Sequence, residues 1–310
     1  MEENVVDYES IMSDCGVGVL PVNQVLSRVS GLEEFYDSEK LVEIYNYFLL
    51  NVTVPEVLCH VIKLTDSYRN QVTLKILLST LNNNRCDDDG YINVRVMCAK
   101  AIANYKDNST LVELLSCLNN KHENYKVRLA CADALGRIGD RFAVKPLLDV
   151  VEDEEEKSVY LKESVTFALG LLGDTSAIDP LISILESKQG LLDKFSFLKE
   201  KIVEALGKLN FHNKKVVKAL KGSLMDSSPM VRINAIEAIM NSEDEDSVEL
   251  IKPCLNDEVD EVKRNALIAL YNLCGRDILD EVIELPIYTK FVKDEAQQLL
   301  DEYENGEEDG

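Results

Sequence analysis

The chain has 310 residues, 46% of them hydrophobic, and its 56 acidic and 33 basic residues give a formal net charge of −23. This apolar content is enough for a large core, whereas so negative a chain would repel a phosphate backbone, so no nucleic-acid partner is expected. Residues 1–4 are acidic, and no apolar run approaches the ~20 residues of a membrane span. We therefore expect a cytoplasmic protein without a membrane partner.

The first 90 residues show no clear repeat and divide into two parts. Residues 1–30 include glycines and a proline and are expected to form a loosely ordered N-terminal arm. Apolar residues in the part from 31–90 fall at helical spacing over 41–50, 54–64 and 71–81. This second part is predicted to consist of degenerate helical repeats.

From residue 91 onward, one sequence pattern recurs about six times. Its anchor is an alanine in a nearly constant setting, and successive anchors are 33, 34, 37, 33 and 31 residues apart. The anchors are Ala101, Ala134, Ala168, Ala205, Ala238 and Ala269. Such a period indicates one structural unit copied along the chain, here over residues 91–285.

Each copy predicts two helices. In the second copy, apolar residues recur at helical spacing over 127–138, the pair Gly139-Asp140 interrupts them, and a second apolar stretch covers 142–151. A two-helix unit of this size cannot bury its apolar face alone, so the copies must stack. We predict an all-α fold, a right-handed α-solenoid of two-helix repeats, with a C-terminal capping helix and an acidic tail in 286–310.

Two series of charged residues keep a fixed distance from the anchor alanines. The basic residues, six positions before each anchor, are Arg95, Arg128, Lys162, Lys199, Arg232 and Lys263. The aspartates, six positions after four of the anchors, are Asp107, Asp140, Asp174 and Asp244. An aspartate before a helix caps its free N–H groups, and stacked Arg–Asp pairs would tie adjacent repeats together. We interpret both series as structural; the alternative is that the cations form a stripe for anionic ligands.

The repeated string V-R-x-x-A/C-x-x-A-L-G-x-I/L-G-D, complete over 127–140 and partial in five other copies, resembles the HEAT repeat of the phycobilisome-lyase type. The resemblance covers roughly residues 91–285 and implies an α-solenoid. It implies little about function, because bilin lyases, chaperone-like adaptors, iron hydroxylases and scaffolds share the repeat. It also implies that the second helix of each repeat lines the inner, concave surface.

One segment departs from the acidity of the chain. Lys214, Lys218 and Lys221 share one face of a predicted second helix and are candidate contacts for a carboxylate or an acidic protein loop. The alternative is that they are ordinary solvated lysines. Together with nearby second-helix residues, the candidate partner-binding set is Lys145, Asp149, Asp179, Lys214, Lys218, Lys221, Glu249 and Lys252.

Neither a metal site nor a catalytic site is expected. The eight cysteines include no C-x-x-C pair and are interpreted as reduced thiols in or near the core. The di-iron hydroxylases among HEAT proteins resemble this chain but carry repeated His-Glu pairs, where this sequence has Lys162-Glu163 and Lys199-Glu200. The sequence also contains no nucleophile elbow, P-loop or glycine-rich dinucleotide motif.

Three functional hypotheses follow. The leading one is a non-catalytic scaffold or adaptor that binds a protein partner through its concave face and needs no cofactor. The resemblance implies an alternative, a bilin lyase subunit or phycobiliprotein chaperone, which would bind a bilin and act as half of a heterodimer. Such a lyase needs chiefly a chromophore cradle, so the missing catalytic motif leaves the enzyme question open. The third hypothesis is a regulatory module whose acidic loops occupy a basic protein.

Overall fold

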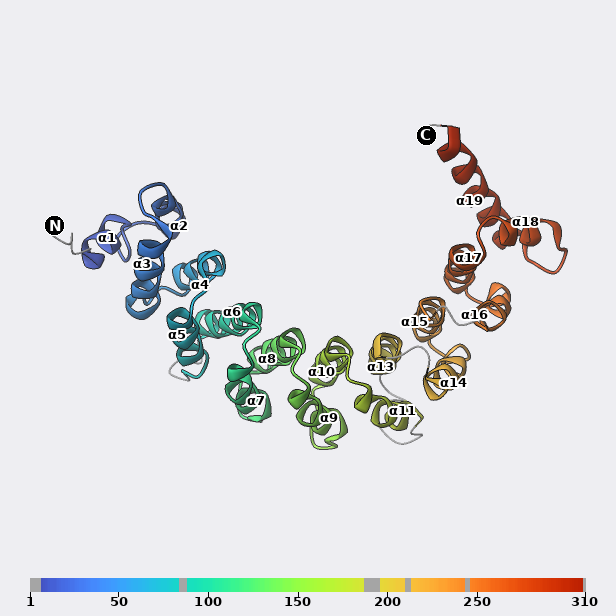
Figure 1. The fold of residues 1–310 in the computed structure, drawn as a ribbon, viewed down its shortest axis with the longest axis horizontal. Helices are drawn as coiled ribbons and strands as arrows, with labels where there is room; N and C mark the ends of the chain where they lie inside the picture. The colour runs from blue at the N-terminus through green and yellow to red at the C-terminus, as the bar shows by residue number, and fades with distance from the viewer. Residues whose placement is uncertain (1–6, 84–87, 187–195, 210–212, 243–245, 309–310) are drawn as a thin grey trace. The chain divides into compact units, whose positions relative to one another are not determined.

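The computed structural model describes residues 7–83, 88–186, 196–209, 213–242 and 246–308. Every regular element in those ranges is a helix, and successive helices form two-helix repeats packed side by side (Figure 1). The chain divides into an N-terminal unit, Met1–Pro146, and a C-terminal unit, Leu147–Gly310. The predicted all-α solenoid of stacked two-helix repeats is confirmed in each unit.

The N-terminal unit places the two helices of its repeats in separate rows. The first helices are α2 (Val22–Gly31), α4 (Pro55–Leu64), α6 (Asp89–Tyr105) and α8 (Tyr125–Ile138). The second helices are α3 (Ser38–Asn51), α5 (Gln71–Leu81) and α7 (Leu111–Asn119). Consecutive first helices contact one another, and the helices predicted within residues 31–90 are present as α3, α4 and α5.

Residues 7–30, which were expected to belong to a loosely ordered N-terminal arm, are mostly helical. They contain α1 (Tyr8–Asp14) and most of α2, which packs against α4 and buries Val25 and Val29. Gly16 and Gly18 have positive φ angles of 75° and 78°, so these glycines form the turn between the two helices. Glycines in this segment therefore build a tight turn between two helices and do not by themselves indicate a loose segment.

The C-terminal unit continues the same two rows. Its first helices are α10 (Val159–Leu172), α13 (Ser196–Leu209), α15 (Pro229–Met240) and α17 (Asp260–Cys274). Its second helices are α11 (Ile178–Glu186), α14 (Lys214–Ser223), α16 (Ser247–Ile251) with the 3-10 helix η6 (Lys252–Asn256), and α18 (Asp277–Glu284). The helix predicted after residue 286 is α19 (Lys290–Glu308), which packs on α17 and α18; α9 (Val144–Glu152) spans the division between the units.

Within the C-terminal unit, the first helices pack more closely than the second helices. Small residues permit this approach: a Cβ atom added to Gly170 of α10 would lie 3.2 Å from the Cα atom of Ala205 in α13. The unit bends toward the closely packed row, so first helices line its inner side and second helices its outer side (Figure 1). The expectation that second helices line the inner surface is therefore wrong for this unit.

Most basic residues of the first helices bind the ends of second helices or the loops between repeats. Arg95 donates from Nε to the carbonyl oxygen of Leu81 at 2.7 Å and from both Nη atoms to the carboxylate of Glu123 at 2.8 and 2.5 Å. It thus connects the end of α5 with the loop before α8. Comparable contacts join Arg128 to Leu118 O, Lys162 to Val151 O, Lys199 to Asp226, and Arg232 to Asp226 O and Asp257, whereas Lys263 pairs with Asp260 within its own helix. The structural interpretation of the cations is supported.

The aspartates of the second series cap the helices that follow them. The side chains of Asp107, Asp140 and Asp174 accept N–H groups at the starts of η3 (Asn108–Thr110), η4 (Arg141–Ala143) and η5 (Thr175–Ala177). Asp244 lies outside the described residues. The capping prediction is confirmed for these three. Arg95, Lys199 and Arg232 pair with Glu123, Asp226 and Asp257, acids in the loops before first helices.

Candidate protein-binding surface

Three of the eight candidate residues lie together on α14. The side chain of Asn213 caps this helix by accepting the N–H of Lys215 at 2.9 Å. Val216, Ala219 and Leu220 bury its apolar face against neighbouring helices. Lys214, Lys218 and Lys221 are consequently exposed on the opposite side, at the helical spacing that the sequence predicts.

The other five candidates are spread over neighbouring second helices. Lys145 and Asp149 are exposed on α9, at the division between the two units. Asp179 of α11 accepts from Lys215 at 2.7 and 2.9 Å, and Lys252 forms an ion pair with Glu281 at 2.7 Å. These two ion pairs connect successive repeats, which gives Asp179 and Lys252 a structural role.

The structure brings Lys221 and Glu249 together at a groove between α14 and α16. This α14–α16 groove has a volume of about 510 Å³. Its lining residues are Lys221, Leu224, Met225, Glu249, Leu250, Pro253, Cys254, Asn256 and Asp257. The thioether side chain of Met225 is 86% exposed, so a large apolar group faces solvent at a groove that also holds a cation and an anion.

A proline shapes the groove. Pro253 is the second residue of η6, two positions after the end of the five-residue helix α16. Because proline has no N–H and its ring clashes with the preceding turn, the α-helix cannot continue through it, and the chain tightens into a 3-10 helix. The second helix of this repeat is therefore short, which leaves space beside the end of α14.

Two buried groups fix the floor of the groove. Arg232 donates from Nη2 to Asp257 at 2.7 Å, so this carboxylate is already neutralised. Burial raises the pKa of the Cys254 thiol to about 11, so the thiol stays protonated at neutral pH and is a poor nucleophile. The groove thus offers apolar contact and charge pairing at its rim, which suit recognition of a side chain.

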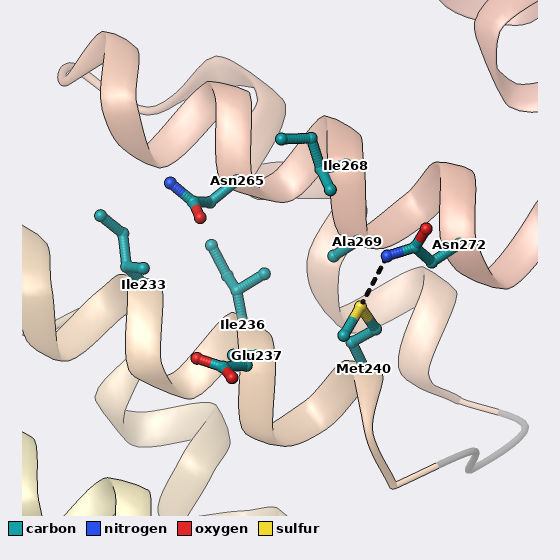
Figure 2. Close-up of a pocket in the computed structure, with 8 residues that line it drawn as sticks. All are labelled: Ile233, Ile236, Glu237, Met240, Asn265, Ile268, Ala269 and Asn272. Atoms are coloured by element: carbon teal, nitrogen blue, oxygen red, sulfur yellow. Dashed lines mark hydrogen bonds between the residues drawn. The ribbon is translucent and has the colours of Figure 1, made fainter. Parts of the chain in front are cut away.

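A second, smaller groove lies on the inner row. Figure 2 shows it between α15 and α17, with a volume of about 180 Å³. Its lining residues are Ile233, Ile236, Glu237, Met240, Asn265, Ile268, Ala269 and Asn272. Asn272 donates from Nδ2 to the Met240 sulfur at 3.5 Å and closes one end of the groove.

Of the residues that line the two grooves, the candidate set predicted from the sequence contains only Lys221 and Glu249. The apolar residues of α15 and α17 follow the core pattern of the repeat, so those that reach the groove could not be distinguished from those that fill the core. Met225 follows the last turn of α14 and belongs to no periodic stretch. The structure shows Ile268, next to the anchor Ala269, as 40% exposed on the flank of α17.

The described part of the chain holds no cluster of three or more His, Cys, Asp or Glu side chains that could bind a metal ion. The seven cysteines in the described ranges are free thiols, and Cys98 and Cys131 are fully buried, as expected; Cys86 lies outside those ranges. Among the described helices, none is both long and apolar enough to cross a bilayer.

Comparison with known families agrees with this architecture. The sequence matches HEAT repeats over residues 82–160 and 189–271 and the PBS lyase HEAT-like repeat over residues 161–187. The HEAT-repeat matches alone cover more than half of the chain. The chain therefore belongs to the HEAT-repeat family, as the repeated string predicts. No curated protein sequence matches it.

Several solved structures are similar. Kap121p is 12% identical over 96% of this chain and 38% of that chain, with a TM-score of 0.52. Kap95p, in a structure with RanGDP, is 15% identical over 94% and 43% of the two chains, with a TM-score of 0.50. The complex of CpcE and CpcF of phycocyanin lyase from Nostoc sp. PCC7120 is 20% identical over 76% and 89%, with a TM-score of 0.48. Identities this low indicate a similar fold alone.

Proposed function

We propose that this protein is a non-catalytic helical-repeat scaffold that binds a protein partner through the C-terminal unit. The observation that carries the proposal is the α14–α16 groove, whose lining combines apolar side chains such as Met225 and Leu250 with the charged residues Lys221 and Glu249. The proposed contact surface is on the outer row of second helices, because α14 belongs to that row. It is therefore not on the concave face, where the sequence led us to expect it.

The exposed Met225 side chain is central to this proposal. Burying a methionine side chain against a partner is worth about 1.5–3 kcal/mol, which is the size of a binding hot spot. Lys221 and Glu249 would orient the partner by pairing with an acid and a base on either side of the apolar contact. Such a surface serves recognition and needs no cofactor.

The groove variants Met225→Glu and Lys221→Glu are each expected to weaken partner binding by about tenfold, or ~1.4 kcal/mol. The tagged protein is used to capture its stoichiometric partner from native cell extract at ~0.15 M salt, and the dissociation constants of the purified pair are then measured by calorimetry. Both side chains are exposed, so the substitutions should leave folding unchanged.

Matched control variants test whether a substitution weakens partner binding only when it lies in the groove. Ile287→Glu places the same charge on an apolar side chain that is 64% exposed outside the groove, and Lys157→Glu reverses an exposed lysine in a loop. Both should bind like the wild type. If the groove variants stay within about 0.5 kcal/mol of the wild type, the groove is not the binding surface.

One observation favours a second function. Residues 161–187 match the PBS lyase HEAT-like repeat, which keeps a bilin lyase subunit or phycobiliprotein chaperone as the alternative. For a scaffold, we expect no change in visible absorption when the purified protein is mixed with an equimolar open-chain tetrapyrrole. A stoichiometric absorption change, or capture of a phycobiliprotein subunit or a second HEAT-repeat chain, would favour the alternative.

A further inference from the structure

Four consecutive first helices expose the residue at their second position. Tyr160 of α10 is 71% exposed, Phe197 of α13 is 64% exposed and Met230 of α15 is 43% exposed. Glu261 of α17 is exposed at the same position. Each of the four precedes the anchor alanine of its repeat by eight residues and the basic residue by two. We call these four residues the edge row.

The edge row is continuous along the C-terminal unit. Helices α10, α13, α15 and α17 pack against one another in this order, and all four have the same repeat register. Equivalent positions on stacked, similarly oriented helices lie on the same side of the stack. Neighbouring packed helices are about 8–10 Å apart, so the row presents one side chain at roughly that interval.

The row changes character along its length. Its first three members are large apolar side chains that are exposed to water. A polar side chain at this position would be equally compatible with the start of a helix. Its fourth member is an acid, and the nearby Glu258 side chain is 84% exposed. Three apolar positions are thus followed by a negative end, on a chain whose net charge is −23.

A polyproline-II helix has the spacing that this row requires. It rises about 3.1 Å per residue with three residues per turn, so every third side chain returns to the same face after about 9 Å. Aromatic side chains on a surface are the usual partners of such segments, because the preformed helix loses little entropy on binding. A β-strand returns to the same face after about 6.6 Å and an α-helix, over seven residues, after about 10.5 Å, so the polyproline-II repeat of about 9 Å fits the interval best.

We propose that the edge row binds an extended, polyproline-II segment of a partner protein. Apolar side chains three residues apart would contact Tyr160, Phe197 and Met230, and an Arg or Lys at the next position would pair with Glu261. The inference rests on the proposed function as a protein-binding scaffold, and it concerns a surface separate from the α14–α16 groove. The chemistry of the segment follows from the order of the four side chains.

The spacing is tested with fluorescein-labelled peptides of two kinds and the full-length protein. The matched peptide consists of Leu-Pro-Pro units and one Arg-Pro-Pro unit, and it is made in two versions that carry the Arg unit at opposite ends. The mismatched peptide has the same units with one more proline in each. Fluorescence anisotropy should show about tenfold tighter binding of the matched peptide. Equal affinities of the two spacings, or no binding by either at about 1 mM, would overturn the inference. Either result leaves the test of the α14–α16 groove unaffected.

A charge-reversal variant tests whether the bound segment places its basic residue at the acidic end of the edge row. Glu261→Lys should weaken the Arg-containing peptide about tenfold and reverse the preference toward a peptide with Glu in place of Arg. Phe197→Ala should weaken both peptides, whereas Ile287→Ala, which removes an exposed apolar side chain elsewhere, should weaken neither. Unchanged peptide preference in Glu261→Lys would show that this acid does not contact the segment and would refute the proposed arrangement.

Discussion

Replacing Glu123 with alanine is expected to lower the free energy of unfolding by about 3–5 kcal/mol. Glu123 and Arg95 form a bidentate ion pair in which both side chains are only 6% exposed. Removing the carboxylate leaves the guanidinium buried without its counter-charge, and also releases the loop that holds α8 against α6. Urea denaturation followed by circular dichroism measures the loss.

An exposed pair provides the control. Glu295 accepts from Arg264 at 2.7 Å, also as a bidentate pair, but the arginine side chain is 48% exposed. Glu295→Ala is therefore expected to cost at most about 1 kcal/mol, because water replaces the lost partner. If both alanine variants lost the same stability, burial of the Arg95 pair would not be the source of its strength.

The same pair makes stability depend on pH. Burial opposes ionisation of Glu123, but hydrogen bonds from Arg95 outweigh it and hold the pKa of Glu123 below its ordinary value of 4.5. A carboxyl group with a depressed folded-state pKa contributes stability above that ordinary value, and the contribution is lost as pH falls through the folded-state pKa. Glu123→Gln should therefore flatten the acid limb of the stability curve. An unchanged limb would mean that other carboxyl groups control it.

Replacing Gly170 with leucine is expected to destabilise the protein by about 2–3 kcal/mol through overpacking. A Cβ atom at this position already meets Ala205 at 3.2 Å to Cα and 3.3 Å to Cβ, so a larger side chain must push α13 away from α10. Because the two helices form the closely packed inner row, the displacement would propagate to neighbouring contacts. Urea denaturation again measures the change.

Gly222 of α14 is the matched control. It is also a helical glycine, but no atom lies within 4 Å of the position that its Cβ would occupy. Gly222→Leu should leave stability unchanged or raise it by up to about 1 kcal/mol, since leucine favours the helical conformation. A gain of stability in Gly170→Leu as well would show that the α10–α13 contact has room to relax.

Some features of the fold and of the candidate surface could be predicted from the sequence, and others could not. The exposure of Lys214, Lys218 and Lys221 follows from their spacing, because the apolar residues of the same helix must face the core. The pairing of Arg95 with Glu123 was not accessible, since the two residues are 28 positions apart and meet only when α6 and α8 stack. The predicted partners, the aspartates, cap helices instead.

The sequence by itself determined the repeat, its period and its two helices, because a local apolar pattern and helix-ending residues act over a few turns. It also determined that each helix needs neighbours, since a single unit cannot bury its apolar face. Only the tertiary structure decided which row lies inside the bend and which side chains meet at the grooves. Those outcomes depend on how closely particular small residues, such as Gly170 and Ala205, let helices approach, which is a property of the packed stack.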